Sequence, residues 1–423
     1  MYYLKLLCYL ALFIGLNSFS QNLNDIEIYN TGNSDIIFNQ INSIEFDNQN
    51  RLWAGTANGL SIFDLSTNTW YNFDEPNSTL TWCCENSVNI NTIHWAEAIN
   101  KMYIGTNNGI ISFDNSNNDI NYDDTNWTTN IGLDCSANSS IINAILYDNG
   151  IWSGSTDGLC IEYFGGEGEW LLQNTQTGFY SNHYKSINQN PNTNMIAIGT
   201  MNGGLITYDG EFNNYYSSNS GILDNSVFDA VFDQNNNIII TTPQAGLGIL
   251  TESGSWIWLN TLNSNIPTNS LKNITIDVNN NLWITTLENG LTHYKNNLFY
   301  NYNTSNSNLP DNQINCLSFD QDNNLWIGTN SSGLIKINNP TLDTPSFTKP
   351  FDNIKISASW DLIEVNLHEK GQYEILNQNG QLINTGFFNP GDNKVNTAAF
   401  ASGLYIFKIK TNESAFVYKI LKD

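Results

Sequence analysis

Four histidines are the first residues in this chain whose chemistry suits catalysis or metal binding. None of His94, His183, His293 and His368 has a second histidine or a carboxylate at a spacing typical of metal ligands. The sequence contains neither a Gly-x-Ser-x-Gly elbow nor a Gly-x-x-x-x-Gly-Lys-Ser/Thr loop, so serine-hydrolase and P-loop chemistry are not indicated. We therefore expect no catalytic residue and no metal ligand from recognisable motifs.

The 40 acidic residues offer a second kind of chemistry. Retaining and inverting glycosidases need two carboxylates at set separations. Glu288 and Asp157, in loops between expected strands, are examples of acids that would serve. Acids are too abundant here to identify a pair, so a polysaccharide lyase or hydrolase stays an open alternative.

Three turns rich in Asp and Asn, at residues 233–237, 277–281 and 320–324, resemble the start of a calcium loop. They lack the central glycine and the closing glutamate of such loops. Their side chains equally suit the hydrogen bonds of a tight turn. We expect structural turns, with a weak Ca²⁺ site as the alternative and no other cofactor.

The elements that position these residues come from an internal repeat. The phrase Leu325-Trp326-Ile327-Gly328-Thr329, with a glycine shortly after it, has seven copies roughly 45 residues apart. They begin at residues 52, 102, 151, 196, 238, 282 and 325. In the first copy the pattern predicts four strands, at 41–47, 52–56, 60–64 and 70–73. One such sheet cannot bury both faces alone, so the repeat predicts a seven-bladed β-propeller in an all-β protein.

The sequence also predicts how the ring of blades closes. The last copy is cut off at Pro340 before a fourth strand, while Ile26-Glu27-Ile28-Tyr29-Asn30 precedes the first copy. An N-terminal strand that completes the last blade would remove an open edge. We expect the propeller to span residues 21–340.

Aligning the copies places one residue of each near the start of its innermost strand, on the face where the loops after the second and fourth strands lie. These residues are Asn42, Asn91, Asn143, Lys185, Phe228, Lys272 and Asn315. Amides with two lysines form a candidate site for hydroxyls or a carboxylate of a glycan. Alternatively, the amides tie neighbouring blades through backbone hydrogen bonds. Trp82 and Trp127, expected in loops on the same face, would either stack on sugar rings or plug the fold.

The phrases Leu325-Trp326-Ile327-Gly328-Thr329 and Gly333-Leu334 resemble the two-component regulator propeller repeat. The resemblance covers roughly residues 22–340. It implies a propeller of the kind found in extracellular sensor domains of bacterial hybrid kinases. These residues make the fold rather than a site, so the resemblance implies little about function.

The N-terminus has the pattern of a signal peptide over residues 1–20. One lysine precedes an apolar run at 6–16, and Ser18-Phe19-Ser20 supplies small residues before a cleavage site at Gln21. No other stretch reaches about 18 apolar residues, so we expect no transmembrane segment in the mature chain.

Export makes disulfides relevant. Cys83 and Cys135 stand at the same offset before equivalent strands, so we expect a disulfide between Cys135 and either Cys83 or Cys84. Cys160 and Cys316 lie in strand patterns and are expected to be small buried apolar residues.

The C-terminal part differs in chemistry. Residues 341–350 contain Pro345 and Pro350 among small polar residues and are expected to be a linker. Residues 351–423 form a run of short strands with an Asn379-Gly380 turn, which predicts a small β-sandwich. The signals Gly380, Gly403, Tyr405, Lys419 and Lys422 resemble the type IX secretion system C-terminal sorting domain of Bacteroidota.

This second resemblance implies the type IX secretion machinery as a partner and passage through the outer membrane. The protein would then be released or held at the cell surface, with the sorting domain often removed. An accessory sandwich with a binding role of its own is the alternative.

The net charge of the chain excludes one further class of function. A formal net charge of −25, with only 15 basic residues, excludes sequence-independent binding to nucleic acid. We expect a secreted or surface-displayed binding propeller without catalysis, which contacts a glycan, a peptide or a surface protein. The alternatives are the polysaccharide-active enzyme and a stand-alone extracellular sensor.

Overall fold

The computed structural model describes two units of the chain separately. In the first unit it describes residues 23, 26–73, 89–116, 126–131, 141–163, 169–338 and 340. In the second it describes residues 354–356, 362–367, 370–377, 381–411 and 415–422. Contacts divide the chain between them into Met1–Pro340 and Thr341–Asp423. The expected signal peptide and the expected linker at 341–350 lie outside the described residues.

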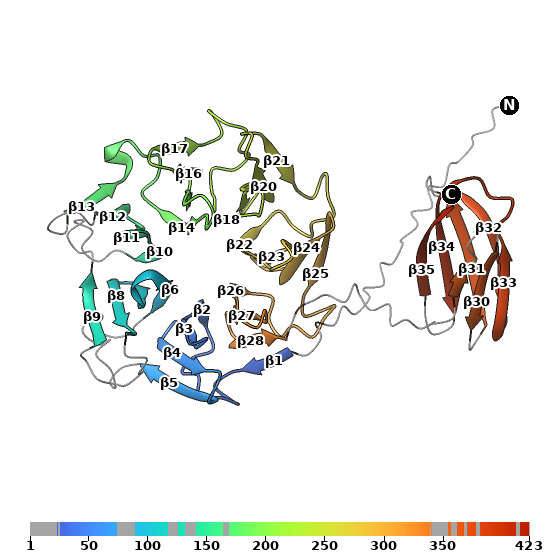
Figure 1. Ribbon diagram of the computed structural model, residues 1–423, viewed down its shortest axis with the longest axis horizontal. Helices are drawn as coiled ribbons and strands as arrows, with labels where there is room; N and C mark the ends of the chain where they lie inside the picture. Colours follow the sequence, from blue (N-terminus) through green and yellow to red (C-terminus); the bar gives the residue numbers. More distant parts are fainter. Residues whose placement is uncertain are drawn as a thin grey trace, which may run out of the picture. The chain divides into compact units, whose positions relative to one another are not determined.

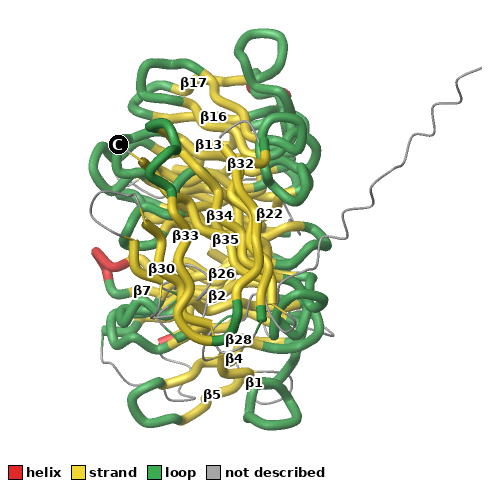
Figure 2. Tube along the Cα trace, turned by 90° about the vertical axis from the view of Figure 1, so that its right-hand side faces the viewer, coloured by secondary structure: helices red, strands yellow, loops and turns green. Residues whose placement is uncertain are grey.

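The described part of the first unit contains seven four-stranded antiparallel sheets arranged as blades in a ring (Figure 1). The innermost strand of each blade contacts that of the next, and the innermost strands of the last and first blades also touch. Seen from the side, the strands run between two layers of loops (Figure 2). The predicted propeller architecture is confirmed.

Blades 1 to 3 are numbered in chain order, and their strands run from the innermost outward. Blade 1 consists of β2 (Ile41–Phe46), β3 (Leu52–Thr56), β4 (Gly59–Asp64) and β5 (Thr69–Phe73). Blade 2 consists of β6 (Ile90–Ala96), β7 (Lys101–Thr106), β8 (Gly109–Asp114) and β9 (Trp127–Ile131). Blade 3 consists of β10 (Ile142–Tyr147), β11 (Ile151–Ser155), β12 (Leu159–Tyr163) and β13 (Glu169–Gln173).

Blades 4 to 7 follow the same plan. Blade 4 has β14 (Tyr184–Gln189), β15 (Ile196–Thr200), β16 (Leu205–Tyr208) and β17 (Phe212–Tyr215). Blade 5 has β18 (Asp229–Phe232), β19 (Ile238–Thr241), β20 (Leu247–Leu250) and β21 (Trp256–Leu259). Blade 6 has β22 (Leu271–Ile276), β23 (Leu282–Thr286), β24 (Leu291–Lys295) and β25 (Leu298–Tyr302). Blade 7 has β26 (Ile314–Phe319), β27 (Leu325–Thr329), β28 (Leu334–Ile337) and, as its outermost strand, β1 (Ile26–Tyr29). Among the described residues, the single-turn 3₁₀ helices η2 (Glu97–Ile99) and η5 (Thr175–Thr177) interrupt the connections.

The N-terminal strand closes the ring as the sequence predicts. β1 pairs antiparallel with β28, from Ile26 opposite Ile337 to Tyr29 opposite Leu334. The closing segment is also tied at Leu23, whose backbone N–H and carbonyl both bond the Asn308 side chain. Without β1, the edge of β28 would present unpaired backbone groups to solvent.

The repeated glycine of the second strand lets adjacent blades approach closely. A Cβ placed on Gly328 would lie 2.7 Å from Cγ2 of Ile41 in blade 1, a distance that packed carbon atoms do not reach. The repeated tryptophan fills the space between blades instead, and Trp53, Trp283 and Trp326 are fully buried.

The acidic turns between the first two strands of a blade anchor these tryptophans. Asp320 accepts the backbone N–H groups of Asp322 and Asn324 through Oδ1. Its Oδ2 accepts the Asn324 amide and the Trp326 indole N–H, each at 2.9 Å. With four N–H donors on one carboxylate, the turn at 320–324 has the structural role that its sequence favours.

A second repeated turn, which follows the outermost strand, is also built from asparagine. At Asn303, the backbone N–H bonds Oδ1 of Asn306, whose amide reaches the carbonyl of Asn301. The same arrangement of asparagine bonds recurs at residues 30–33, 216–219 and 260–263. These polar bonds hold the crossovers from blade to blade.

The second unit is a β-sandwich of two sheets within its described residues. One sheet has the order β29 (Ile354–Ile356), β30 (Leu362–Leu367) and β33 (Gly391–Asn396). The other has the order β32 (Leu382–Phe388), β31 (Gly371–Asn377), β34 (Gly403–Thr411) and β35 (Ala415–Lys422). Val365, Ile375 and Phe407 lie in its core. β31 and β32 form a hairpin, as the Asn-Gly turn predicts.

Candidate functional site

The predicted ring residues occupy bulges at the start of the innermost strands. In blade 1, Ile41 pairs with Thr56 and Ser43 with Gly55, so Asn42 is an extra, unpaired residue. The same register shift occurs in blades 2, 3, 4, 6 and 7, whereas the described pairing of β18 in blade 5 is regular. A bulge turns its extra residue out of the ladder, which aims these side chains differently from their neighbours.

Three of the amides bond the backbone of the following blade. Asn42 donates to the carbonyl of Ile90, Asn143 to that of Tyr184, and Asn315 to that of Ile41. The distances from Nδ2 to the carbonyl oxygen are 2.9, 3.0 and 3.0 Å. Asn91 differs, because its amide bonds Oδ1 of Asn107. The tie between neighbouring blades, the alternative that the sequence left open, therefore uses the N–H side of three amides.

The two lysines also reach the next blade, but toward the described residues they leave most of their hydrogen-bonding capacity unused. Lys272 Nζ donates to Oδ1 of Asn315 at 2.9 Å. Lys185 Nζ lies 5.8 Å from the centre of the Phe228 ring. Neither ammonium group forms an ion pair with a carboxylate of the described residues.

We call the region around the ring residues the channel mouth. The burial and spacing of its basic side chains shift their pKa values. Burial lowers the pKa of Lys185. Burial also lowers the pKa of Lys272; Cys316 opposes this change, and the charge of Lys185 adds to it. Burial and the charge of Lys185 also lower the pKa of His183, while the charge of Asp157 raises it. These groups therefore feel one another around a small region of positive potential in a strongly acidic protein.

Further along the innermost strands the titratable groups tend toward neutrality. Burial raises the pKa of Glu45 to about 7 and that of Asp229 to about 6. His94 accepts the backbone N–H of Tyr147 at its Nε2, and burial lowers its pKa to about 4. Burial thus shifts each of these groups toward its uncharged form, and at neutral pH the shift is complete only for His94.

Trp127 is not a mouth residue. It lies on β9 rather than in a loop, is 9 % exposed, and packs between Phe73 and Phe113 with ring centroids 5.1 and 4.8 Å away. A side chain so enclosed has no free face for a sugar ring, so its assignment as a stacking residue is corrected. Trp82 lies outside the described residues.

The cysteines need a second correction. Cys160 lies buried on β12 as its strand pattern indicates, but it takes part in a disulfide bond and is not a simple apolar residue. Cys83, Cys84 and Cys135 lie outside the described residues, so their pairing stays a prediction. Cys316 is a free, half-buried thiol, and burial raises its pKa to about 12.

Other candidate chemistry is scattered. Asp157 and Glu288 lie in blades 3 and 6, on different sides of the ring. His293 is buried and stacks on Trp283 with ring centroids 4.0 Å apart, and burial lowers its pKa to about 4. Within the described ranges, no group of three or more His, Cys, Asp or Glu residues is placed to hold a metal ion.

The C-terminal signals take structural positions in the sandwich. Gly403 has φ of +151°, a conformation that side chains disfavour. Tyr405 is 8 % exposed and donates to the carbonyl of Ala401, while Lys422 donates to that of Thr397. Lys419 lies on β35, and Gly380 falls outside the described residues.

Comparison with protein families assigns this second unit. Residues 352–423 match the family model of the secretion system C-terminal sorting domain. This unit is a type IX sorting domain. The two component regulator propeller model matches residues 35–58 and 308–331, in blades 1 and 7. Both predicted resemblances are confirmed, and the sorting domain marks the protein for export to the cell surface or beyond it.

Solved structures show the same fold at low sequence identity. The extracellular domain of BT3049 from B. thetaiotaomicron, described as a hybrid two component system, is 17% identical with a TM-score of 0.63 over 94% of this chain. PorZ, a surface component of the type-IX secretion system of Porphyromonas gingivalis, is 16% identical with a TM-score of 0.55 over 92%. This chain covers 57% and 60% of those two chains.

A lyase shares the propeller as well. Virginiamycin B lyase from Staphylococcus aureus is 13% identical with a TM-score of 0.55, over 74% of this chain and 98% of the lyase. At these identities the likeness shows the fold alone. No curated protein matches this chain. In the part of the chain that the structure describes, no helix is long and apolar enough to cross a membrane.

Proposed function

We propose that this protein is an exported, non-catalytic binding propeller whose channel mouth holds the carboxylates of an acidic glycan. The observation that carries the proposal is the pair Lys185 and Lys272, two partly buried ammonium groups with no carboxylate partner among the described residues. Burying a charge without a partner is unfavourable. A bound anion would remove that cost.

The charge of the whole chain makes this pair unusual. Between residues 21 and 340 the sequence has only six basic residues, and two of them stand in the ring. Of the others, Arg51, Lys101 and Lys336 each lie within ion-pair distance of an acid. A positive mouth on an acidic surface favours anions at that point and repels them elsewhere.

The asparagine amides would orient the glycan by hydrogen bonds to its hydroxyl groups. With its N–H side directed at the next blade, Asn143 keeps its oxygen to accept a hydroxyl hydrogen. The oxygens of Asn42 and Asn315 already accept the Gln40 amide and the Lys272 ammonium, and each has one further lone pair for a ligand. Asn315 Oδ1 already positions Lys272 Nζ, so a carboxylate at this lysine would join an existing polar network.

The test is calorimetric titration of the full chain with oligogalacturonate, with its methyl ester as the uncharged control. We expect binding of the acid but not of the ester, and a loss of about tenfold or more in affinity for Lys185→Gln and for Lys272→Gln. Lys101→Gln, which removes a lysine on β7 that faces Asp114, should bind as the wild type does.

Two results would overturn the proposal. Equal binding of acid and ester, or affinity unchanged in both ring variants, would remove the role of the lysines. Oligogalacturonate recovered in shortened or unsaturated form after incubation would show catalysis and favour the enzyme alternative.

A further inference from the structure

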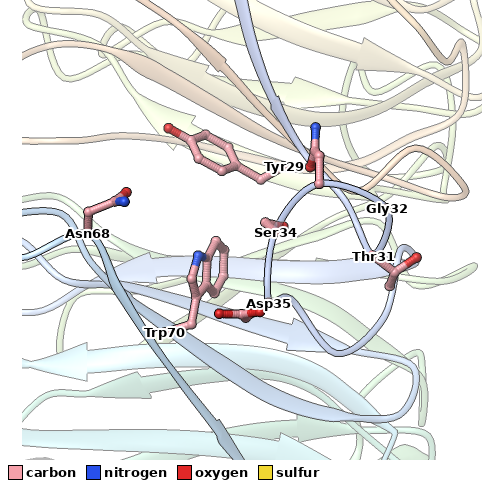
Figure 3. Close-up of a pocket in the computed structure, with 8 residues that line it drawn as sticks. Tyr29, Thr31, Gly32, Ser34, Asp35, Asn68 and Trp70 are labelled. Carbon is pink, nitrogen blue, oxygen red and sulfur yellow. The ribbon is translucent and has the colours of Figure 1, made fainter.

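A pocket lies on the outer wall of the propeller, away from the channel. It has a volume of about 610 Å³ and sits where the closing strand β1 meets β5, the outermost strand of blade 1. Tyr29, Trp70, Asp35 and Asn68 line it together with the turn at 31–34 (Figure 3). We call it the rim pocket.

Aromatic rings give the rim pocket a rigid floor. The Trp70 indole stacks on Phe63 with centroids 4.4 Å apart and planes 11° apart. Tyr29 lies 6.1 Å from Trp70 at an angle of 56°, and its hydroxyl donates to Glu27. The two rings therefore hold fixed positions before any ligand arrives.

The other blades show what this junction looks like when it is filled. Phe73 and Trp127 meet at the next junction, and Tyr215 and Trp256 meet between blades 4 and 5. In both cases the indole N–H is buried without an acceptor among the described residues. The Trp70 N–H also has no acceptor among the described residues, but it is not shut away as the other two are. At the Tyr29–Trp70 junction a pocket accompanies the aromatic pair.

Some polar side chains of the rim pocket form hydrogen bonds within the turn, whereas others are available to a ligand. The side chains of Asn33 and Ser34 hold the turn in place, because both form hydrogen bonds with the backbone of Asn30. The side chains of Asp35 and Asn68 have no hydrogen-bond partner among the described residues, and both point toward Trp70 (Figure 3). The pocket thus offers a carboxylate, an amide and an indole N–H around an aromatic surface.

We propose that the rim pocket binds an uncharged saccharide. Sugar hydroxyls donate to the Asp35 carboxylate and accept from the Trp70 indole and the Asn68 amide, while the C–H groups of a sugar ring pack on aromatic carbon. A volume of about 610 Å³ falls in the range of small-ligand pockets and holds one or two sugar rings. Asp35 repels acidic sugars, so this ligand differs from that of the channel mouth.

The test is saturation-transfer NMR of the full chain with a panel of neutral disaccharides: cellobiose, laminaribiose, maltose, xylobiose, mannobiose and chitobiose. We expect binding of at least one. Trp70→Phe keeps the ring on Phe63 but removes the N–H, and Asp35→Ala removes the acceptor. Each should weaken that binding by about tenfold or more. Trp256→Phe, at the filled junction of blade 5, is the matched control and should bind normally.

Melting temperatures equal to that of the wild type establish that the variants fold. Binding to none of the six sugars, or binding that survives both Trp70→Phe and Asp35→Ala, overturns the proposal. A sugar signal that instead disappears in Lys185→Gln and Lys272→Gln places the sugar in the channel, which also overturns it. The channel proposal fails separately, by the titration with oligogalacturonate.

Discussion

Replacing Asp320 by alanine tests how the acidic turns hold the blades together. Its carboxylate is buried with the residue 7 % exposed and accepts four N–H groups, including the buried Trp326 indole at 2.9 Å. A hydrogen bond to a charged group contributes about 1.5–3 kcal/mol, and a buried donor left without an acceptor costs about 1–3 kcal/mol. Because the backbone donors can turn to water, we expect a loss of about 3–5 kcal/mol in the free energy of unfolding.

Blade 5 offers a matched control for that variant. Asp233 accepts two backbone N–H groups and the Asn237 amide in the same way. However, Ile239 stands where Trp283 and Trp326 follow the acidic turns of blades 6 and 7. Asp233→Ala should therefore cost about 1–2 kcal/mol less than Asp320→Ala. Urea unfolding of the full chain, followed by circular dichroism, measures both. An Asp320→Ala variant within about 1 kcal/mol of the wild type, or a larger loss for Asp233→Ala, would refute the role given to the indole bond.

Three further changes have defined outcomes. Deleting residues 26–30 removes β1 and opens blade 7, so the propeller should lose at least about 3 kcal/mol or aggregate; an unchanged melting temperature would contradict closure by this strand. The pKa of Glu45, raised to about 7, means that its contribution to stability is present below about pH 4.5 and is lost as pH rises through about 7. Glu45→Gln should therefore exceed the wild type in stability by about 2 kcal/mol at pH 8 and not at pH 4, and equal differences at both pH values would sink this assignment. Deleting residues 351–423 should leave the propeller folded but retained in the cell envelope, and normal export of that truncation would contradict its sorting role.

Much of the fold could be predicted because the residues of the repeat have clear packing roles. The phrase around Trp326 and Gly328 combines a large side chain that fills the space between blades with a position where no Cβ fits. The expected strand at 52–56 agrees with β3, and the closing strand differs from the expected 26–30 by one residue. Alternation and turn residues mark such boundaries well when each sheet repeats the same plan.

The sites were harder, because they depend on packing between distant residues. Trp127 was expected in a loop, and only its position on β9 and its packing against Phe73 reveal it as part of the core. The rim pocket joins Tyr29, at the end of the closing strand, to Trp70 of another blade. The sequence predicts both strands but not that a pocket forms where they meet. The disulfide of Cys160 likewise depends on which residues meet in space.

The role of Lys185 and Lys272 as anion-binding groups is tested most directly by NMR of the full chain after reductive methylation of its lysines. Lys185→Gln and Lys272→Gln assign the two signals, and each signal is titrated with pH. Without ligand, we expect both pKa values below the ordinary 10.5, because both side chains are buried. With saturating oligogalacturonate, both should rise toward or above 10.5, because a nearby carboxylate favours the charged form. Lysine pKa values that stay the same with and without oligogalacturonate would contradict an anion site at the channel mouth.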